Sequence, residues 1–257
     1  MKATLTVLGS GTSMGVPTLG CDCRVCNSAD AHDRRTRPSI MVQYNGRVVL
    51  IDTTPDFHAQ AVREKIARVD AVFYTHAHAD HILGLDDLRP LSFRHEGGSI
   101  PLYAKAATAG EIQKVFRYVF DRDPDYATLA KVHIEELDGT VELFGARFEP
   151  VDVLHGRQTI QGFRFGSAAY LTDFSDIPEH SKQRLRSLDI LFLDALRHRP
   201  HPTHSNVENS LRLVEELMPK RAFFTHISHD LPHEATNATF PPNVRLAHDG
   251  LRLEFEI

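Results

Sequence analysis

Short runs of apolar residues, separated by turns rich in glycine and polar residues, recur along the chain. The runs are shorter than a typical helix and rich in β-branched and aromatic residues, which favours strands. The pattern predicts strands within residues 3–11, 39–44, 47–54, 70–76, 132–154, 163–173, 189–195, 221–226 and 244–257.

Helical spacing of apolar residues appears between these strands. It predicts helices over residues 56–66, with Asp56 as the N-cap, over 107–120 and over 206–218. Because strands outnumber helices and helices recur between them, we expect an α/β protein, a four-layer αβ/βα sandwich of two sheets with helices outside. The sequence has no repeat or linker, so we expect a single domain over 1–257.

Two dipeptides predict tight turns between neighbouring strands. Asn45-Gly46 separates SIMVQY from RVVLIDTT, and such a pair favours a two-residue hairpin. Asp249-Gly250 predicts a second hairpin that closes the chain within VRLAHDGLRLEFEI.

Composition and charge narrow the classes of function. The chain of 257 residues is 42% apolar and 25% charged, with a formal net charge of −5. This charge argues against nucleic acid or an anionic membrane as a partner. No apolar run approaches the roughly 18 residues that cross a bilayer. The start, MKATLTVLGSG, lacks the apolar block and cleavage site of a signal peptide, so we expect a cytoplasmic protein.

All three cysteines lie in one short segment. Cys21, Cys23 and Cys26 fall within GCDCRVC, and an odd number in one window does not suit a disulfide framework. The spacing lets three thiolates surround a soft cation, but a structural zinc takes four ligands, so one is missing. The alternative is three reduced thiols on a mobile loop.

The strongest chemical signal is THAHADH at residues 75–81. His76 and His78 alternate on an extended backbone, so both side chains can face the same way. Asp80 and His81 follow where the chain turns, and they can face a second position nearby. Four imidazole and carboxylate groups within six residues suit a hydrolytic centre of zinc, manganese or iron.

With these residues the chain resembles the metallo-β-lactamase superfamily, because THAHADH matches the H-x-H-x-D-H signature at each position. LGSGTSMGVP at 8–17 is similar to the N-terminal glycine loop of tRNase Z-type and PhnP-type members. GCDCRVC, followed by THISHD at 225–230, resembles the PhnP subgroup, the phosphodiesterases of the carbon–phosphorus lyase pathway.

The resemblance implies a catalytic centre of two divalent cations, manganese or zinc. One cation would be held by His76, His78 and His155, the other by Asp80, His81 and His226, with Asp173 bridging and Asp176 as its alternative. Asp52 would orient a ligand histidine through its other ring nitrogen. His229 would complete Cys21, Cys23 and Cys26 as a structural zinc site in a loop at about 20–30. Relatives also suggest a homodimer.

The implied activity is hydrolysis of a small phosphodiester such as 5-phosphoribosyl 1,2-cyclic phosphate. Two cations lower the pKa of a bridging water and supply hydroxide near neutral pH, and we expect turnover to require Asp80. In HRPHPTHSN at 198–206, His204 resembles the PhnP-type histidine that protonates the leaving alkoxide. His198 and His201 lie in the same segment and are the alternatives.

Five arginines are open to two interpretations. They either bind a terminal phosphate of the substrate or form a solvated face of the protein. They are Arg34, Arg35, Arg37, Arg197 and Arg199.

Two other functions share these motifs. A tRNase Z-like nuclease has the same glycine loop and metal motif, but this chain has no long basic insertion and is acidic. A PqqB-like protein of cofactor biosynthesis, which binds without hydrolysing, also carries a zinc-held cysteine loop. The complete set of seven ligands favours hydrolysis, because a binding protein has no need of two cations and a water.

Overall fold

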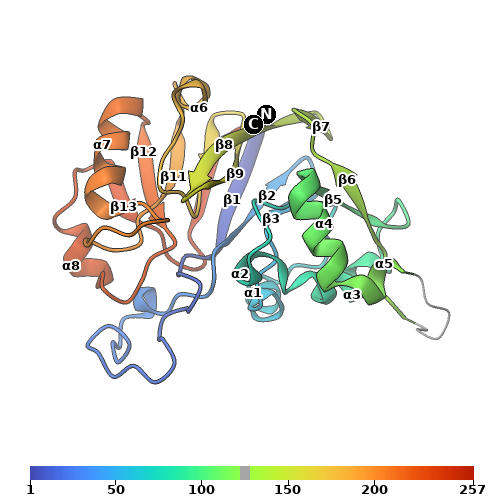
Figure 1. The fold of residues 1–257 in the computed structure, drawn as a ribbon, viewed down its shortest axis with the longest axis horizontal. Coiled ribbons are helices and arrows are strands. Elements are labelled where there is room, and N and C mark those ends of the chain that lie inside the picture. Colours follow the sequence, from blue (N-terminus) through green and yellow to red (C-terminus); the bar gives the residue numbers. More distant parts are fainter. Residues whose placement is uncertain (122–127) are drawn as a thin grey trace.

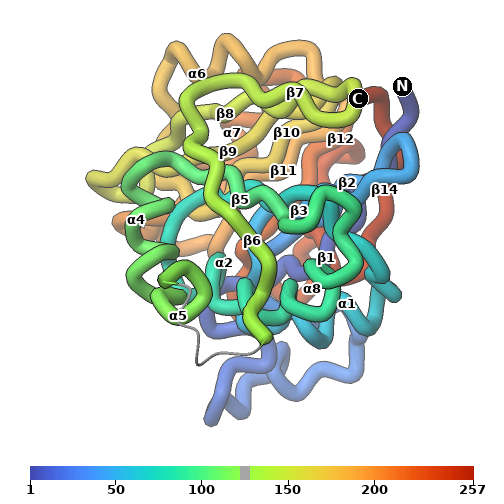
Figure 2. The backbone as a smooth tube through the Cα atoms, turned by 90° about the vertical axis from the view of Figure 1, so that its right-hand side faces the viewer, coloured from blue at the N-terminus to red at the C-terminus, as the bar shows by residue number. Residues whose placement is uncertain are grey.

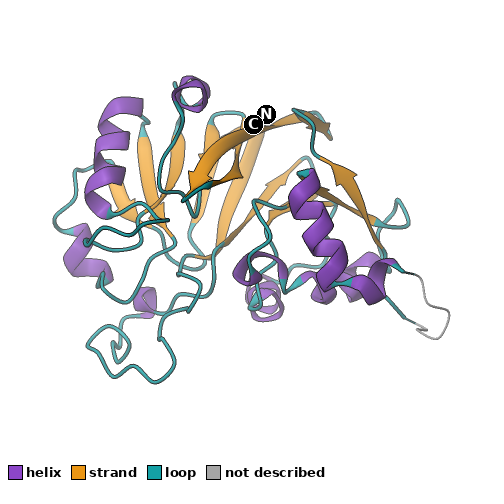
Figure 3. Ribbon diagram, in the orientation of Figure 1, coloured by secondary structure: helices purple, strands orange, loops and turns teal. Residues whose placement is uncertain are grey.

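The computed structural model describes residues 1–121 and 128–257. Two seven-stranded sheets pack face to face, and helices cover their outer faces (Figure 1, Figure 3). This arrangement confirms the predicted four-layer αβ/βα sandwich. No helix in the described part of the chain is long and apolar enough to cross a membrane.

The first sheet has the strand order β14-β1-β2-β3-β4-β5-β6. Its antiparallel half joins β14, β1, β2 and β3, and its parallel half continues from β3 to β6. The strands are β1 (Lys2–Gly9), β2 (Ser39–Tyr44), β3 (Arg47–Ile51), β4 (Ala71–Phe73), β5 (Ile100–Ala104), β6 (Val132–Glu136) and β14 (Arg252–Glu256).

The second sheet has the order β13-β12-β11-β10-β9-β8-β7. It is antiparallel from β7 to β10 and parallel from β10 to β13. The strands are β7 (Val141–Leu143), β8 (Ala146–His155), β9 (Gln158–Phe165), β10 (Ala168–Tyr170), β11 (Ile190–Asp194), β12 (Arg221–Thr225) and β13 (Val244–Leu246).

Helices α1 to α5 lie beside the first sheet, and α6 to α8 lie beside the second (Figure 1). The α-helices are α1 (Phe57–Glu64), α2 (Ala79–Ile82), α3 (Arg89–Ser92), α4 (Ala106–Val115), α5 (Arg117–Phe120), α6 (Glu179–Arg184), α7 (Val207–Leu217) and α8 (His233–Asn237). Two 3₁₀ helices span Ala31–Asp33 and Leu85–Leu88.

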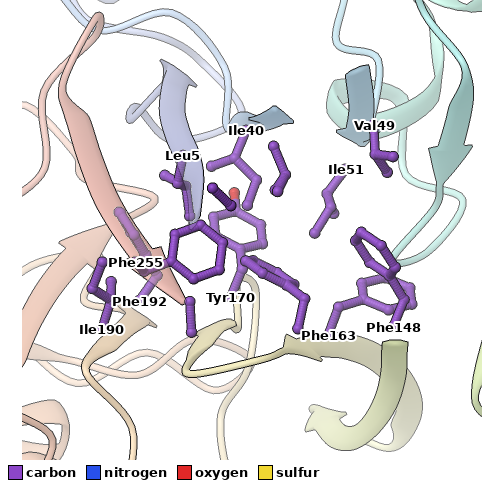
Figure 4. Packing of buried hydrophobic residues seen from close by; sticks show 14 of the residues in the cluster. Leu5, Ile40, Val49, Ile51, Phe148, Phe163, Tyr170, Ile190, Phe192 and Phe255 are labelled. Atoms are coloured by element: carbon purple, nitrogen blue, oxygen red, sulfur yellow. The ribbon is translucent and has the colours of Figure 1, made fainter. Parts of the chain in front are cut away.

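The core between the sheets is built from the inward faces of both (Figure 4). Leu5 and Ile51 of the first sheet and Phe163 of the second are each fully buried. Phe73 of the first sheet stacks on Phe148 of the second, with ring centroids 4.8 Å apart. Truncating such a phenylalanine to alanine lowers the free energy of unfolding by about 3–5 kcal/mol, so this layer holds the two sheets together.

The two predicted hairpins have opposite outcomes. Asn45 and Gly46 both have positive φ, 49° and 71°, and join β2 to β3 as predicted. The second prediction is wrong, because β13 pairs with β12 whereas β14 pairs with β1 in the other sheet. Asp249 accepts hydrogen bonds from the backbone N–H of Ser10 and of Thr36, each 2.9 Å long, so this turn carries the chain between the sheets.

Asp56 precedes α1 as predicted, but its side chain makes no capping hydrogen bond. Its carboxylate instead accepts from the backbone N–H of Arg37 at 2.9 Å and from the Arg37 guanidinium at 3.0 Å. Arg37 lies in the segment between β1 and β2, which contains the cysteines and projects from the sheets (Figure 1, Figure 2). Asp56 therefore attaches α1 to this segment.

Candidate metal centre

Several strands of both sheets end at one edge of the sandwich and place polar side chains there. THAHADH follows β4, His155 is the last residue of β8, and Asp173 and His226 follow β10 and β12. Strands that run in the same direction end at the same edge of their sheet, so the chain direction brings these residues together. THAHADH, His155, Asp173 and His226 thus come from four different strands, and both sheets contribute.

The predicted ligands form two groups that share one residue. His76, His78, His155 and Asp173 have ligand atoms within 4.8 Å of one another, as do Asp80, His81, Asp173 and His226. Asp176, the alternative for the shared position, joins neither group.

The distances around Asp173 match the edges of a coordination polyhedron. Its Oδ1 lies 3.2 Å from His81 Nε2, and its Oδ2 lies 3.3 Å from His226 Nε2 and 3.9 Å from His76 Nε2. Ligand atoms about 2.1 Å from a tetrahedral cation are about 3.4 Å apart. Asp173 therefore has the position of a carboxylate that bridges two cations.

The outward-facing ring nitrogens of three of these histidines are held by hydrogen bonds. Asp52 Oδ2 lies 2.7 Å from His81 Nδ1 and also accepts from the Thr75 hydroxyl, whose oxygen lies 3.0 Å from His76 Nδ1. His155 Nδ1 donates to the carbonyl of Thr203 at 2.9 Å. Because the Nδ1 atoms carry these protons, the Nε2 atoms are left to bind a cation. Asp52 has its predicted place.

Unpartnered polar atoms at the centre fit a bound cation. His76 Nε2, His81 Nε2, Asp80 Oδ2 and both ring nitrogens of His226 are buried and have no hydrogen-bond partner among the described residues. Leaving such groups buried and unpaired costs free energy, roughly 1–3 kcal/mol each. Imidazole and carboxylate donors suit zinc or manganese, so the residues present fit the implied pair of cations.

The pKa values reflect burial and the close contact of carboxylates with imidazoles here. Burial opposes ionisation of Asp173, but His226 and His81 hold its pKa well below the usual range. Burial opposes the charge on His226 as well, yet the carboxylates of Asp173 and Asp80 raise its pKa to about 9. Burial lowers the pKa of His76 well below its usual value. Ionised carboxylates beside imidazoles offer the donors that a divalent cation binds.

Three residues of the centre adopt a left-handed backbone. Asp52, Asp173 and His226 have φ of 65°, 56° and 57°. Residues other than glycine rarely occupy this region, and those that do cluster at functional sites. Each of the three comes just after a strand, where the unusual φ turns the side chain to the common edge.

The N-terminal glycine loop lies against the segment that follows His226. Ile227 N–H donates to Ser10 O at 2.9 Å, and Thr12 N–H donates to Ile227 O at 3.1 Å. A Cβ atom on Gly11 would lie 2.7 Å from the carbonyl oxygen of Arg35, so the close approach requires glycine. The loop therefore helps to position His226.

His204 is the histidine of its segment that lies over the centre. Its ring stacks on His226, with centroids 4.6 Å apart and planes 8° apart, and its Nδ1 lies 2.8 Å from Asp194 Oδ2. His201 packs on His204 from outside, with centroids 5.0 Å apart, and His198 contacts Asn206 through its carbonyl oxygen. Sequence reasoning missed Asp194. Its signal was an aspartate at the end of an apolar strand, as in VVLIDTT.

A cleft of about 720 Å³ opens beside the centre. His76 and His78 form one side, the start of α4 another, and Thr159 of β9 a third. Lys114 of α4 also lines it and pairs with Glu111 at 2.6 Å. A volume of 300–1,000 Å³ is typical of small-molecule sites.

The cysteines meet His229 as predicted. The Sγ atoms of Cys21, Cys23 and Cys26 lie 3.2, 3.5 and 3.4 Å from His229 Nδ1. In a tetrahedral zinc site a sulfur and a nitrogen ligand are about 3.6 Å apart, so four donors surround one position. A backbone N–H from Cys26 lowers the pKa of Cys23 to about 7, whereas burial raises that of Cys26 to about 11.

The arginines after the cysteines hold the loop together. Arg35 is fully buried, and its guanidinium donates to the carbonyls of Ser228 and Leu231 at 2.8 and 2.7 Å and pairs with Asp33 at 2.9 Å. Both interpretations are therefore wrong for Arg35. Arg34 donates to backbone carbonyls of the loop, among them that of Ser28 at 2.8 Å. Arg37 pairs with Asp56, as described above.

The other two candidate arginines lie near the segment of His204. Arg197 contacts the carbonyl of Arg199, and Arg199 lies 3.6 Å from Asp230. The Arg199 side chain is largely exposed. Neither lines the cleft beside His76 and His78.

Comparison with known proteins identifies the class. A family model described as a β-lactamase superfamily domain matches residues 47–227, and the chain belongs to this superfamily. A crystal structure described as a new diphosphatase from the PhnP family is 61% identical, with a TM-score of 0.94, over 99% of this chain and 98% of that one. Within the superfamily, the protein is therefore a member of the PhnP family.

Two further relatives are more distant. An octanoyltransferase of Porphyromonas gingivalis is 38% identical over 249 residues, which are 95% of this chain and 50% of that protein. The chain thus spans about half the length of that relative. The structure of zinc-bound PqqB from Methylobacterium extorquens is 23% identical, with a TM-score of 0.76 over 97% of this chain and 99% of that one. It shares the fold.

Proposed function

We propose that this protein is a metal-dependent phosphodiesterase of small phosphorylated molecules, with 5-phosphoribosyl 1,2-cyclic phosphate as its first candidate substrate. The observation that carries the proposal is the position of Asp173 between two groups of histidines, with Asp80 and His204 at the same centre.

Each residue of the centre then has a role. His76, His78 and His155 would hold one manganese or zinc ion, Asp80, His81 and His226 would hold the other, and Asp173 would contribute to both groups. Two such cations lower the pKa of a water molecule and offset the charge of phosphate oxygens. Cys21, Cys23, Cys26 and His229 would hold a structural zinc.

Hydrolysis of a phosphodiester joins a water oxygen to phosphorus and breaks one P–O bond. The departing alkoxide needs a proton, and an imidazole at the site is suited to donate it. The geometry suits His204 to this role, because its Nδ1 lies 2.8 Å from Oδ2 of buried Asp194, which orients the ring. His204 is only partly exposed, beside the ligand His226. We therefore assign the role of general acid to His204.

A second candidate reaction is cleavage of a diphosphate bond, and the 61% identical diphosphatase favours it. In a diphosphate diester each phosphorus carries one ester oxygen and one oxygen shared with the second phosphorus. A phosphodiester likewise has two substituted oxygens on phosphorus, so the same centre suits both reactions. A phosphate leaves more readily than an alkoxide, so a diphosphate would depend less on His204.

The two other functions suit the structure less well. The lining of the cleft includes one lysine, Lys114, already paired with Glu111, which is a weak surface for the phosphates of tRNA. A PqqB-like binding protein does not require a proton donor, whereas His204 lies where one would be needed and is held by Asp194.

The experiment is hydrolysis by the manganese-loaded protein, followed by phosphorus NMR in ¹⁸O-labelled water. The substrates are 5-phosphoribosyl 1,2-cyclic phosphate, a dinucleotide with a diphosphate bridge and a bis-aryl phosphodiester. We expect the cyclic phosphate to react fastest, with ¹⁸O in the phosphoryl product. Preference for the diphosphate would select the second candidate. No reaction of any substrate, with both cations bound by elemental analysis, would reject the hydrolase.

A further inference from the structure

A further group of residues whose side chains could hold a metal ion lies apart from both sites. His32, in the 3₁₀ helix Ala31–Asp33, and His233 and Glu234, at the start of α8, have ligand atoms within 4.8 Å of one another. His32 Nδ1 lies 3.8 Å from Glu234 Oε1 and 3.7 Å from Asp30 Oδ1. None of these residues has a role in the catalytic centre or the cysteine site.

His233 is the least expected member of the group. His233 is only 4% exposed, and its Nδ1 is buried without a hydrogen-bond partner among the residues described. A buried polar nitrogen without a partner costs about 1–3 kcal/mol. A cation shared with His32 would satisfy this nitrogen, because neutral imidazole is the commonest metal ligand of proteins.

The backbone positions both histidines without help from their rings. Asp33 Oδ1 accepts the backbone N–H of His233 at 2.9 Å and also the guanidinium of Arg35 at 2.9 Å. Asp30 Oδ1 accepts the backbone N–H of His32 at 2.9 Å. Because neither ring takes part in these contacts, both are left to bind a ligand in a preorganised arrangement.

Charge and access also suit a cation. Glu234 and Asp30 supply two carboxylates beside His32, and the positive charge of Arg35 is paired with Asp33. The side chains of Glu234 and His32 are 77% and 42% exposed, so an ion can enter from solvent. The ring of His248 packs on His32, with centroids 4.2 Å apart, and limits its movement.

We propose that His32, His233 and Glu234 bind a further divalent cation of the zinc class, separate from the catalytic centre and from the cysteine site. Two imidazoles and one carboxylate are a known ligand set for zinc, with water in the fourth position. The ion would join the segment after the cysteines to α8. His229, which lies beside the cysteine Sγ atoms, is in the loop between β12 and α8, four residues before His233.

The test is calorimetric titration of Zn²⁺ into the full-length protein whose catalytic and cysteine sites are already saturated with zinc. We expect one additional binding event in the unmodified protein. It should be lost in His32→Ala and weakened at least tenfold in Glu234→Gln, whose exposed side chain leaves folding intact. His180→Ala, which removes an exposed histidine elsewhere, should leave it unchanged.

Two results would overturn the proposal. One is the absence of any additional zinc binding by the saturated protein, and the other is an unchanged event in His32→Ala. Hydrolytic activity is not the readout, so the result is independent of the proposed reaction. Circular dichroism of each variant checks that the fold is retained.

Discussion

The histidines around Asp173 differ in what their ring nitrogens contact, and this difference indicates different functions. His76, His81 and His155 each have Nδ1 in contact with an oxygen of the protein, which leaves Nε2 for a cation. His204 has a buried carboxylate at Nδ1 but belongs to neither of the two groups around Asp173. This difference suits His204 to proton transfer.

We expect His204→Ala to slow hydrolysis of an alkyl phosphodiester about 10²–10⁴-fold, because the alkoxide loses its proton donor. A diester with a nitrophenolate leaving group needs no proton and should react at nearly the normal rate. The measurement is kcat for both substrates. His201→Ala is the control, because its ring packs outside His204. Equal losses with both substrates would instead give His204 a positioning role.

Single residues of the centre differed in how well the sequence predicted them. His76, His78, Asp80 and His81 stand in one local motif, and the structure brings them together. Asp194 is 10 residues from His204, and the sequence does not record that the two side chains meet. The positive φ of Asp173 is also absent from the sequence pattern, since it is imposed by packing around the strand end.

At the level of elements, turn dipeptides predicted strand pairing correctly where the two strands beside the turn pair with each other. Asn45-Gly46 joins two strands that pair with each other, so its preferred conformation and the fold agree. Asp249-Gly250 has the same local signal, but the Asp249 carboxylate accepts hydrogen bonds from Ser10 and Thr36, which are distant in sequence. Tertiary contacts therefore directed β14 to the first sheet, which the local signal could not reveal.

The segment between β1 and β2 should depend on its metal. We expect His229→Ala to lose one zinc per chain and to lower the free energy of unfolding by about 2–5 kcal/mol, as loss of a native cross-link does. Arg35 still holds the segment to Ser228 and Leu231, so the sheets should stay folded. The measurements are elemental analysis and denaturant unfolding.

The control for this variant is activity with cations in excess, which should persist because His229 lies outside the groups around Asp173. Limited proteolysis should cut the variant within about residues 20–30 before the unmodified protein. A full complement of zinc in His229→Ala would contradict the Cys₃His site.

At the scale of the whole molecule, the candidate centre connects the two sheets. His76, His78, Asp80 and His81 follow a strand of the first sheet, whereas His155, Asp173 and His226 belong to the second. The layered fold was predictable from the order of apolar runs. The 720 Å³ cleft was not, because α4 and β9, which line it together, are distant in sequence. The single domain and the homodimer stay predictions.

Because both sheets supply ligands, removal of the cations should weaken the whole sandwich. A ligand present at a thousandfold excess over its Kd stabilises a folded protein by about 4 kcal/mol. We expect the chelator-treated protein to unfold at a lower guanidinium concentration, and added Mn²⁺ to restore most of the loss. Manganese is the informative ion, because it binds imidazole and carboxylate but is a poor partner for the three thiolates.

Hydrogen exchange can locate this effect. On removal of the cations, backbone amide exchange should accelerate at residues 75–81, which follow a strand of the first sheet. It should also accelerate beside the strands of the second sheet, at residues 153–156, 172–174 and 225–227. Mn²⁺ should restore protection in both sets together, because Asp173 contacts His76 and His81 from the first sheet and His226 from the second. Recovery confined to one sheet, or unfolding that does not respond to Mn²⁺, would show that the cations do not join the two halves.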